Sequence, residues 1–144
     1  MNLVTVNNPP RVLVVDDDRD FRDAHAALIR EQGCEVETAG DGEQALVMLA
    51  FNPYDLLVTD WQMPRLDGAS LVHWLRATES TLPVVMITGA NAAAELPAGI
   101  RREVKAVLPK PVPPGHLIAV LHRILRLDPV PESKHATIFD AATA

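Results

Sequence analysis

The chain has 144 residues, of which 48% are hydrophobic and 22% charged, the ordinary balance of one globular domain. Its 13 lysine and arginine residues against 19 aspartate and glutamate residues give a net charge of −6, which disfavours electrostatic attachment to nucleic acid or to an anionic membrane. A single cysteine excludes an internal disulfide, and no apolar run approaches the ~20 residues of a membrane-spanning helix. We therefore expect a cytoplasmic protein with no membrane insertion and no direct binding of nucleic acid.

The two ends of the chain differ from its middle. Residues 1–10 end in Asn-Asn-Pro-Pro and are expected to form an irregular lead-in. Residues 128–144 open with Asp-Pro-Val-Pro and then lose helical or strand periodicity, which predicts a C-terminal tail or the stump of a linker. The folded domain is thus expected over residues 11–127.

Between these ends, short apolar runs alternate with segments of helical spacing. The apolar runs predict buried strands, and they span residues 12–15, 36–39, 56–59, 84–87 and 106–108. The segments with helical spacing follow each strand, and they span residues 21–29, 45–49, 71–75, 91–103 and 117–125. Pro97 and Gly99 interrupt the fourth of these helical segments.

This alternation predicts an α/β fold, because parallel strands are joined by helical, right-handed crossovers. The expected architecture is a doubly wound five-stranded parallel sheet in the order 2-1-3-4-5, with helices on both faces. A closed eight-stranded barrel is excluded by the chain length.

Polar residues stand at the carboxyl end of four of the predicted strands. Asp16 and Asp17 follow the first strand, Asp60 follows the third, Thr88 ends the fourth and Lys110 follows the fifth. Strands 1 and 3 are neighbours in the predicted order, and the crevice at their carboxyl ends is where doubly wound sheets bind ligands. We therefore expect the three carboxylates to converge, with a hydroxyl and an ammonium group nearby.

Three clustered carboxylates repel one another unless positive charge lies among them. Lys110 neutralises one of them, and the others favour a divalent cation with oxygen ligands, for which Mg²⁺ is suited. A carboxylate, Mg²⁺, a lysine and a hydroxyl are the groups needed to receive and stabilise a phosphoryl group. The alternatives are that residues 16–18 form a solvated strand end with a helix N-cap, and that Asp60 is an ordinary turn residue.

Four stretches of the sequence carry a resemblance to a known family. They are Val-Leu-Val-Val-Asp-Asp-Asp (12–18), Val-Thr-Asp-Trp-Gln-Met-Pro-Arg-Leu-Asp-Gly (58–68), Val-Val-Met-Ile-Thr-Gly (84–89) and Leu-Pro-Lys-Pro-Val (108–112). With these motifs, residues 11–127 resemble the receiver domain of two-component response regulators, of the chemotaxis-regulator type. The resemblance implies a flavodoxin-like sheet and a role in phosphorelay signalling.

The resemblance also implies roles for the acidic residues. Asp60 is the expected phosphoacceptor, which takes a phosphoryl group from a phosphohistidine on a sensor histidine kinase or a histidine phosphotransfer domain. Asp17 is expected to bind Mg²⁺ (or Mn²⁺) directly and Asp16 through water, with Asp60 and the backbone carbonyl of Gln62 as further ligands.

The remaining implied roles concern the switch. Thr88 is expected to hydrogen-bond a phosphoryl oxygen, Lys110 to pair with the phosphoryl charge, and Pro111 to follow a cis peptide bond. The family usually has an aromatic residue where this chain has Val107, so the switch position is atypical. The expected output surface comprises segment 91–103, the fifth strand and the last helix, and it would control an unknown downstream protein, with homodimerisation as a possibility.

Two other functions remain as alternatives to this regulatory, non-enzymatic one. An aspartate-nucleophile phosphatase needs a second acid two residues after the nucleophile, where this chain has Gln62. A degenerate receiver that acts as a constitutive docking module is favoured only by Val107 and the unusual segment 91–103. The chain is either a stand-alone regulator or part of a larger signalling protein.

The five histidines show no pair at metal-ligand spacing on one helix face, and we expect them at the surface. They are His25, His73, His116, His122 and His135.

Overall fold

The computed structural model describes residues 8–127, so residues 1–7 of the predicted lead-in and the predicted tail, 128–144, lie outside the described residues. The strands are β1 (Arg11–Val15), β2 (Glu35–Ala39), β3 (Leu56–Asp60), β4 (Val84–Gly89) and β5 (Ala106–Lys110). The helices are α1 (Arg19–Glu31), α2 (Gly42–Phe51), α3 (Gly68–Ala77), α4 (Ala90–Ala93), α5 (Ala98–Glu103) and α6 (Pro114–Leu125).

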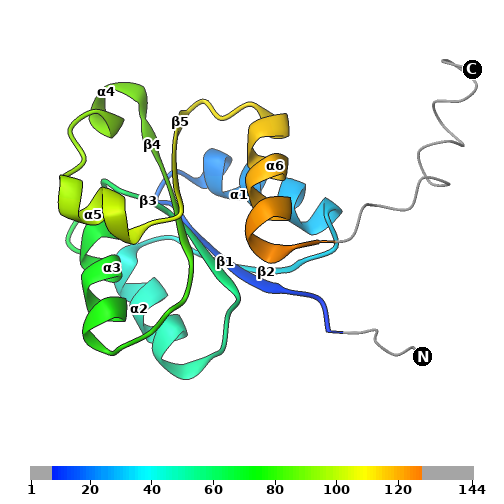
Figure 1. Cartoon of the computed structure of the whole chain (residues 1–144), viewed down its shortest axis with the longest axis horizontal. Helices are drawn as coiled ribbons and strands as arrows, with labels where there is room; N and C mark the ends of the chain where they lie inside the picture. The colour runs from blue at the N-terminus through cyan, green and yellow to red at the C-terminus, as the bar shows by residue number, and fades with distance from the viewer. Residues whose placement is uncertain (1–7, 128–144) are drawn as a thin grey trace, which may run out of the picture.

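The five strands form one parallel sheet in the order β2-β1-β3-β4-β5 (Figure 1), which confirms the predicted fold class and strand order. Helices α1 and α6 pack on one face of the sheet, whereas α2, α3 and α5 pack on the other. Because each strand runs in the same direction, all five carboxyl ends meet at one edge of the molecule.

The two hydrophobic cores explain why the strands read as continuous apolar runs. Val12 and Val14 point into the core shared with α1 and α6. Leu13 and Val15 point into the core shared with α2, α3 and α5. A strand buried on both faces has no solvent-facing side and needs no alternating polar residue. Within residues 8–127, no helix combines the length and the apolar character needed to cross a membrane.

The connection between β4 and β5 is two short helices in place of one regular helix. Pro97 is the N-cap of α5 and supplies no amide hydrogen, so a helix that starts at Ala90 cannot continue through it. Ile100 is buried and anchors α5 to the sheet, whereas α4 has no buried residue.

Strand β5 is longer than the sequence predicts, because it pairs with β4 as far as Lys110. Pro109 lies within it opposite Thr88. A proline is tolerated here because β5 is an edge strand, on which one amide faces away from the sheet. The longer strand makes Lys110 a strand residue in register with Gly89.

The start of α3 is packed directly against the end of β3. Asp67 is the N-cap of α3 and accepts a hydrogen bond from the Ser70 amide at 2.9 Å. The amide of Gly68 donates to the carbonyl oxygen of Trp61 at 2.7 Å. A Cβ atom on Gly68 would lie 2.3 Å from the carbonyl oxygen of Asp60, a distance that real Cβ atoms do not adopt. The Asp-Gly pair therefore allows α3 to begin against the backbone of Asp60.

We predict that Gly68→Ala destabilises the protein by about 1–3 kcal/mol, the usual cost of overpacking a tight site. The added methyl group would force the backbone of Asp60 or the first turn of α3 to move. Urea denaturation of the two proteins measures the difference in the free energy of unfolding.

The control is Gly115→Ala, because a Cβ atom on this helical glycine has no other atom within 4 Å. This substitution is expected to leave stability unchanged or to raise it by about 0.5–1 kcal/mol. Equal stability of Gly68→Ala and the wild type would contradict the packing argument.

Candidate functional site

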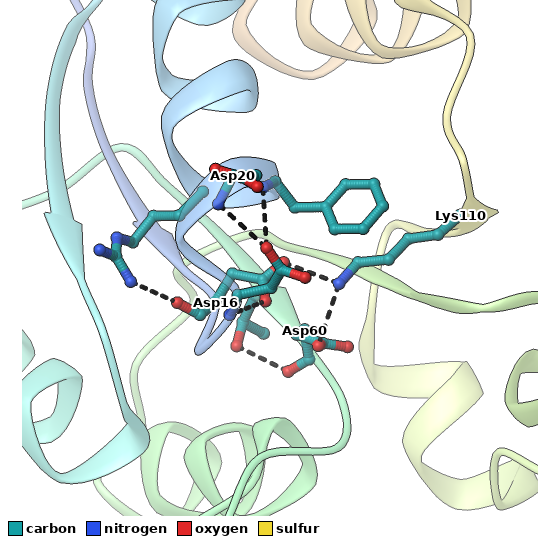
Figure 2. Close-up of polar contacts among 8 residues, drawn as sticks. Asp16, Asp20, Asp60 and Lys110 are labelled. Atoms are coloured by element: carbon teal, nitrogen blue, oxygen red, sulfur yellow. Dashed lines mark hydrogen bonds and ion pairs between the residues drawn. The ribbon is translucent and has the colours of Figure 1, made fainter.

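The ammonium group of Lys110 lies between the carboxylates of Asp16 and Asp60 (Figure 2). Its Nζ atom is 2.8 Å from Asp16 Oδ2 and 3.2 Å from Asp60 Oδ2. Asp16 follows β1, Asp60 ends β3 and Lys110 ends β5, so one cation joins the carboxyl ends of three strands. Both carboxylates are buried, with residue exposures of 2% and 8%. The predicted convergence of these three residues is present.

Asp17 completes an acidic cluster at the same edge. One carboxylate oxygen from each of Asp16, Asp17 and Asp60 lies within 4.8 Å of the others. Asp17 is exposed, unlike the other two acids. Three carboxylates with one ammonium leave the cluster with a formal charge of about −2, and its exposed side is open to a cation from solvent.

Every polar atom of Asp16 makes a hydrogen bond or an ion pair. Its amide donates to the Ala39 carbonyl at 3.2 Å, and its own carbonyl accepts from an Arg22 guanidinium nitrogen at 3.0 Å. Its Oδ1 atom accepts from the Asp18 amide at 2.9 Å, while Oδ2 accepts from Lys110. These contacts fix the orientation of the carboxylate before any ligand binds.

Asp18 has a structural role, in agreement with the alternative of a helix N-cap. Its side chain accepts hydrogen bonds from the amides of Asp20 and Phe21, at 2.9 and 3.3 Å, at the start of α1. The run of three aspartates therefore contains two members of the acidic cluster and one helix cap.

Burial and neighbouring charge shift the pKa values of the central pair. Burial raises the pKa of Asp60, and the nearby Asp16 raises it further, while the ion pair with Lys110 opposes both. Burial lowers the pKa of Lys110, but its hydrogen bonds and ion pairs with Asp16 and Asp60 outweigh this, and the net shift is upward. Lys110 therefore stays protonated at neutral pH and compensates the buried carboxylates.

Thr88 and Gln62 are two further predicted site residues. Thr88 is buried near the end of β4. Among the described residues, its hydroxyl makes no side-chain hydrogen bond to Asp60 or Lys110, so the predicted contact with a phosphoryl oxygen stays a prediction. Gln62 is exposed in the loop after β3, two residues beyond Asp60.

Val107 and Pro111 lie on either side of Lys110 in the chain. Val107 is partly buried on β5 and packs against the core shared with α2, α3 and α5. The peptide bond between Lys110 and Pro111 is cis.

Two neighbours of the site were not expected from the sequence. The Nζ atom of Lys110 lies 4.3 Å from the centre of the Phe21 ring.

His25, one turn further along α1, is 7% exposed, so its predicted surface position is wrong. It is buried because it lies on the helix face that packs toward the sheet, beside Ala26 and Ile29. Its burial lowers the pKa of His25, partly opposed by Asp16, while Lys110 adds to the decrease.

We predict that Asp60→Asn raises the free energy of unfolding of the metal-free protein at neutral pH, because Asp60 is buried and has a raised pKa. The folded wild type binds this proton more tightly than the unfolded chain does. Its stability therefore falls as the pH rises from the ordinary value of 3.8 through the raised one. Urea denaturation between pH 3 and 8 in EDTA measures the effect.

The advantage of the variant is expected to vanish below the ordinary carboxyl pKa, where both states of the wild type are protonated. Asp23→Asn is the control, because this carboxylate is 61% exposed and pairs with Arg19 on the helix surface. A variant at residue 60 that is less stable than the wild type at pH 7 would show that the Lys110 ion pair outweighs the burial of Asp60.

Residues 12–122 match the family described as the response regulator receiver domain. The chain is 38% identical over 135 residues to the response regulator MprA of Mycobacterium sp. strain KMS, an alignment that covers 92% of this chain and 59% of the relative. It is 40% identical over 116 residues to the response regulator MprA of Mycobacterium avium strain 104, covering 81% of this chain and 51% of the relative. The chain thus matches little more than half the length of these relatives.

Comparison with solved structures also finds receiver domains. The receiver domain of NtrX from Brucella abortus superposes with a TM-score of 0.73 at 34% identity, over 81% of this chain and 99% of that one. The receiver domain of the Francisella response regulator 1452 superposes with a TM-score of 0.72 at 32% identity, over 81% of this chain and 98% of that one. The chain therefore belongs to the receiver domain family of response regulators, the regulatory proteins of two-component signalling.

Proposed function

We propose that Asp60 is a phosphoacceptor, which takes a phosphoryl group from a phosphohistidine on a sensor histidine kinase or a histidine phosphotransfer domain. The observation that carries this proposal is the buried carboxylate of Asp60, held 3.2 Å from the Lys110 ammonium beside two further acids. A carboxylate in this setting is held next to a cation that compensates incoming negative charge.

The acidic cluster fits a magnesium ion. Opposite oxygen ligands of octahedral Mg²⁺ are about 4 Å apart, and one oxygen from each of Asp16, Asp17 and Asp60 lies within 4.8 Å of the others. Small movements, or a water in place of one oxygen, would complete the geometry. We propose Asp17 and Asp60 as direct ligands, Asp16 as a ligand through water, and the backbone carbonyl of Gln62 as a further ligand. Mn²⁺ fits the same oxygen donors.

In the proposed transfer, a carboxylate oxygen of Asp60 attacks the phosphorus atom, the bond from phosphorus to the donor imidazole nitrogen breaks, and the imidazole leaves with the electron pair. When bound, the metal ion supplies positive charge to the phosphoryl oxygens. Lys110, whose Nζ atom lies 3.2 Å from Asp60 Oδ2, supplies a second positive charge. The chain catalyses only its own phosphorylation and dephosphorylation.

The phosphoryl group would carry the signal to the side of the sheet that holds β4 and β5. It adds about −1.5 to −2 charges and three strong hydrogen-bond acceptors, and we propose that these attract the Thr88 hydroxyl and retain Lys110. The proposed output surface comprises α4, α5, β5 and α6, and it binds a downstream protein or a second copy of the chain. Because residue 107 is a valine, no aromatic ring at this position can rotate during the proposed switch.

We predict that incubation with acetyl phosphate and Mg²⁺ adds a single phosphoryl group, detected by intact-mass spectrometry. The adduct should be absent from Asp60→Asn, because the proposed nucleophile is missing, and absent in EDTA, because the acidic cluster needs a cation to accept an anionic donor. We propose the cytoplasm as the location of phosphorylation by the partner's phosphohistidine.

Asp23→Asn is the matched control, since it removes an exposed carboxylate of α1 outside the cluster and should leave the adduct intact. Beryllofluoride, which mimics an attached phosphoryl group, should saturate the wild type even if the adduct turns over too quickly to be trapped. A folded wild type that binds Mg²⁺ but neither acquires the adduct nor binds beryllofluoride would rule out the phosphoacceptor.

A further inference from the structure

The ring of Phe21 forms a third contact of the Lys110 ammonium, after its two ion pairs. Lysine has three N–H donors, and Asp16 and Asp60 account for two of them. The Nζ atom lies 4.3 Å from the ring centre, within the distance of about 6 Å at which a cation is attracted to an aromatic face. We propose that Phe21 is a positioning residue, whose ring holds the Lys110 ammonium beside Asp60 by a cation–π interaction. Its effect on phosphorylation rests on the proposed function of Asp60.

The position of the ring is set by the same short segment that supplies the acidic residues. Phe21 is the third residue of α1, and its amide donates to the N-cap Asp18 at 3.3 Å. His25 follows one turn later, with its ring centre 5.9 Å from that of Phe21 and the two planes tilted by 31°. His25 is buried, so Phe21 has a fixed aromatic neighbour on its own helix. The backbone of Phe21 is thus fixed at the first turn of α1, and its ring has His25 as an aromatic neighbour.

The surroundings favour a strong interaction. The side chain of Lys110 is only 14% exposed and those of Asp16 and Asp60 are 3% and 9% exposed, so little water competes for the ammonium. Cation–π attraction increases when the cation is desolvated in this way. Phe21 itself is only partly buried, and it lines a surface pocket together with Pro111 and Val112.

An aromatic ring serves here in a way that a third carboxylate would not. A carboxylate would bind the ammonium tightly and would repel an incoming phosphoryl group. The ring attracts the cation without adding a formal charge. The N–H groups of Lys110 can still donate hydrogen bonds to carboxylate or phosphoryl oxygens. Lys110 can therefore exchange a carboxylate oxygen for a phosphoryl oxygen while it keeps the same contact with Phe21.

The test varies the charge on the ring face and keeps its shape. Phe21 is replaced by 4-fluoro-, 3,4-difluoro- and 3,4,5-trifluorophenylalanine, which progressively weaken the negative face, and by cyclohexylalanine, which keeps the bulk but has no π electrons. The initial rate of phosphorylation by acetyl phosphate at saturating Mg²⁺ should fall stepwise with each fluorine. Cyclohexylalanine should slow it by up to about five- to thirty-fold, which corresponds to loss of the whole free energy of a partly to fully desolvated cation–π contact.

The matched control places the same residues at Phe51, which is 81% exposed on α2 and lies outside the site. These proteins should react at the wild-type rate. A second readout needs no phosphorylation: in the wild type, the ring current of Phe21 should shift the Lys110 ε-methylene protons upfield in the NMR spectrum. Cyclohexylalanine at position 21 should abolish this shift.

A rate that does not depend on the fluorine content, with cyclohexylalanine as active as phenylalanine, would overturn the proposal and leave Phe21 as packing alone. If the wild type itself gave no adduct at Asp60, the proposed function would fail, and the NMR shift would then decide on the contact independently. An unshifted Lys110 methylene in the wild type would overturn the cation–π interaction in either case.

Discussion

The shared ammonium group of Lys110 is the interaction on which the site depends. Asp16 and Asp60 are two buried carboxylates at neighbouring strand ends, and without a cation between them their negative charges would repel each other. Lys110 reaches them from β5, which is separated from β3 in the sheet by β4. The site therefore forms only when β1, β3, β4 and β5 are paired in one sheet, because its acids come from the ends of β1 and β3 and its cation from the end of β5.

Backbone contacts orient the same residues before any ligand arrives. The peptide of Asp16 is held between Ala39 and Arg22, and the backbone of Asp60 lies against Gly68. Neither contact carries chemistry, but each limits how far a carboxylate can move. The residues of such a site need little rearrangement when a cation or a phosphoryl group binds, so little binding free energy is lost to it.

The connection between β4 and β5 is held by fewer contacts than the acidic cluster. Helix α4 has four residues, no side-chain cap and no buried residue, whereas α5 is anchored by Ile100. Segments with few buried contacts open at low free-energy cost. The acidic cluster is thus held by several contacts, whereas α4, which begins two residues after Thr88, is weakly anchored. This contrast suits the proposed transmission of a signal from Asp60 to a partner.

The sequence by itself determined the strands, their order and the placement of polar residues at their carboxyl ends. Continuous apolar runs such as 12–15 have one interpretation in a chain of alternating strands and helices, and the handedness of crossovers then leaves few topologies. The break at Pro97 was also visible, because a proline interrupts a helix wherever the helix lies.

Only the tertiary structure decided which groups touch. It separated a buried Asp16 from an exposed Asp17, placed His25 inside the fold, and brought the ring of Phe21 to Lys110, 89 positions later in the numbering. The physical reason is that periodicity reports the conformation of a segment and the face that it buries. Distances between side chains remote in sequence are set by how α1 and β5 pack on a common sheet, which no local pattern encodes.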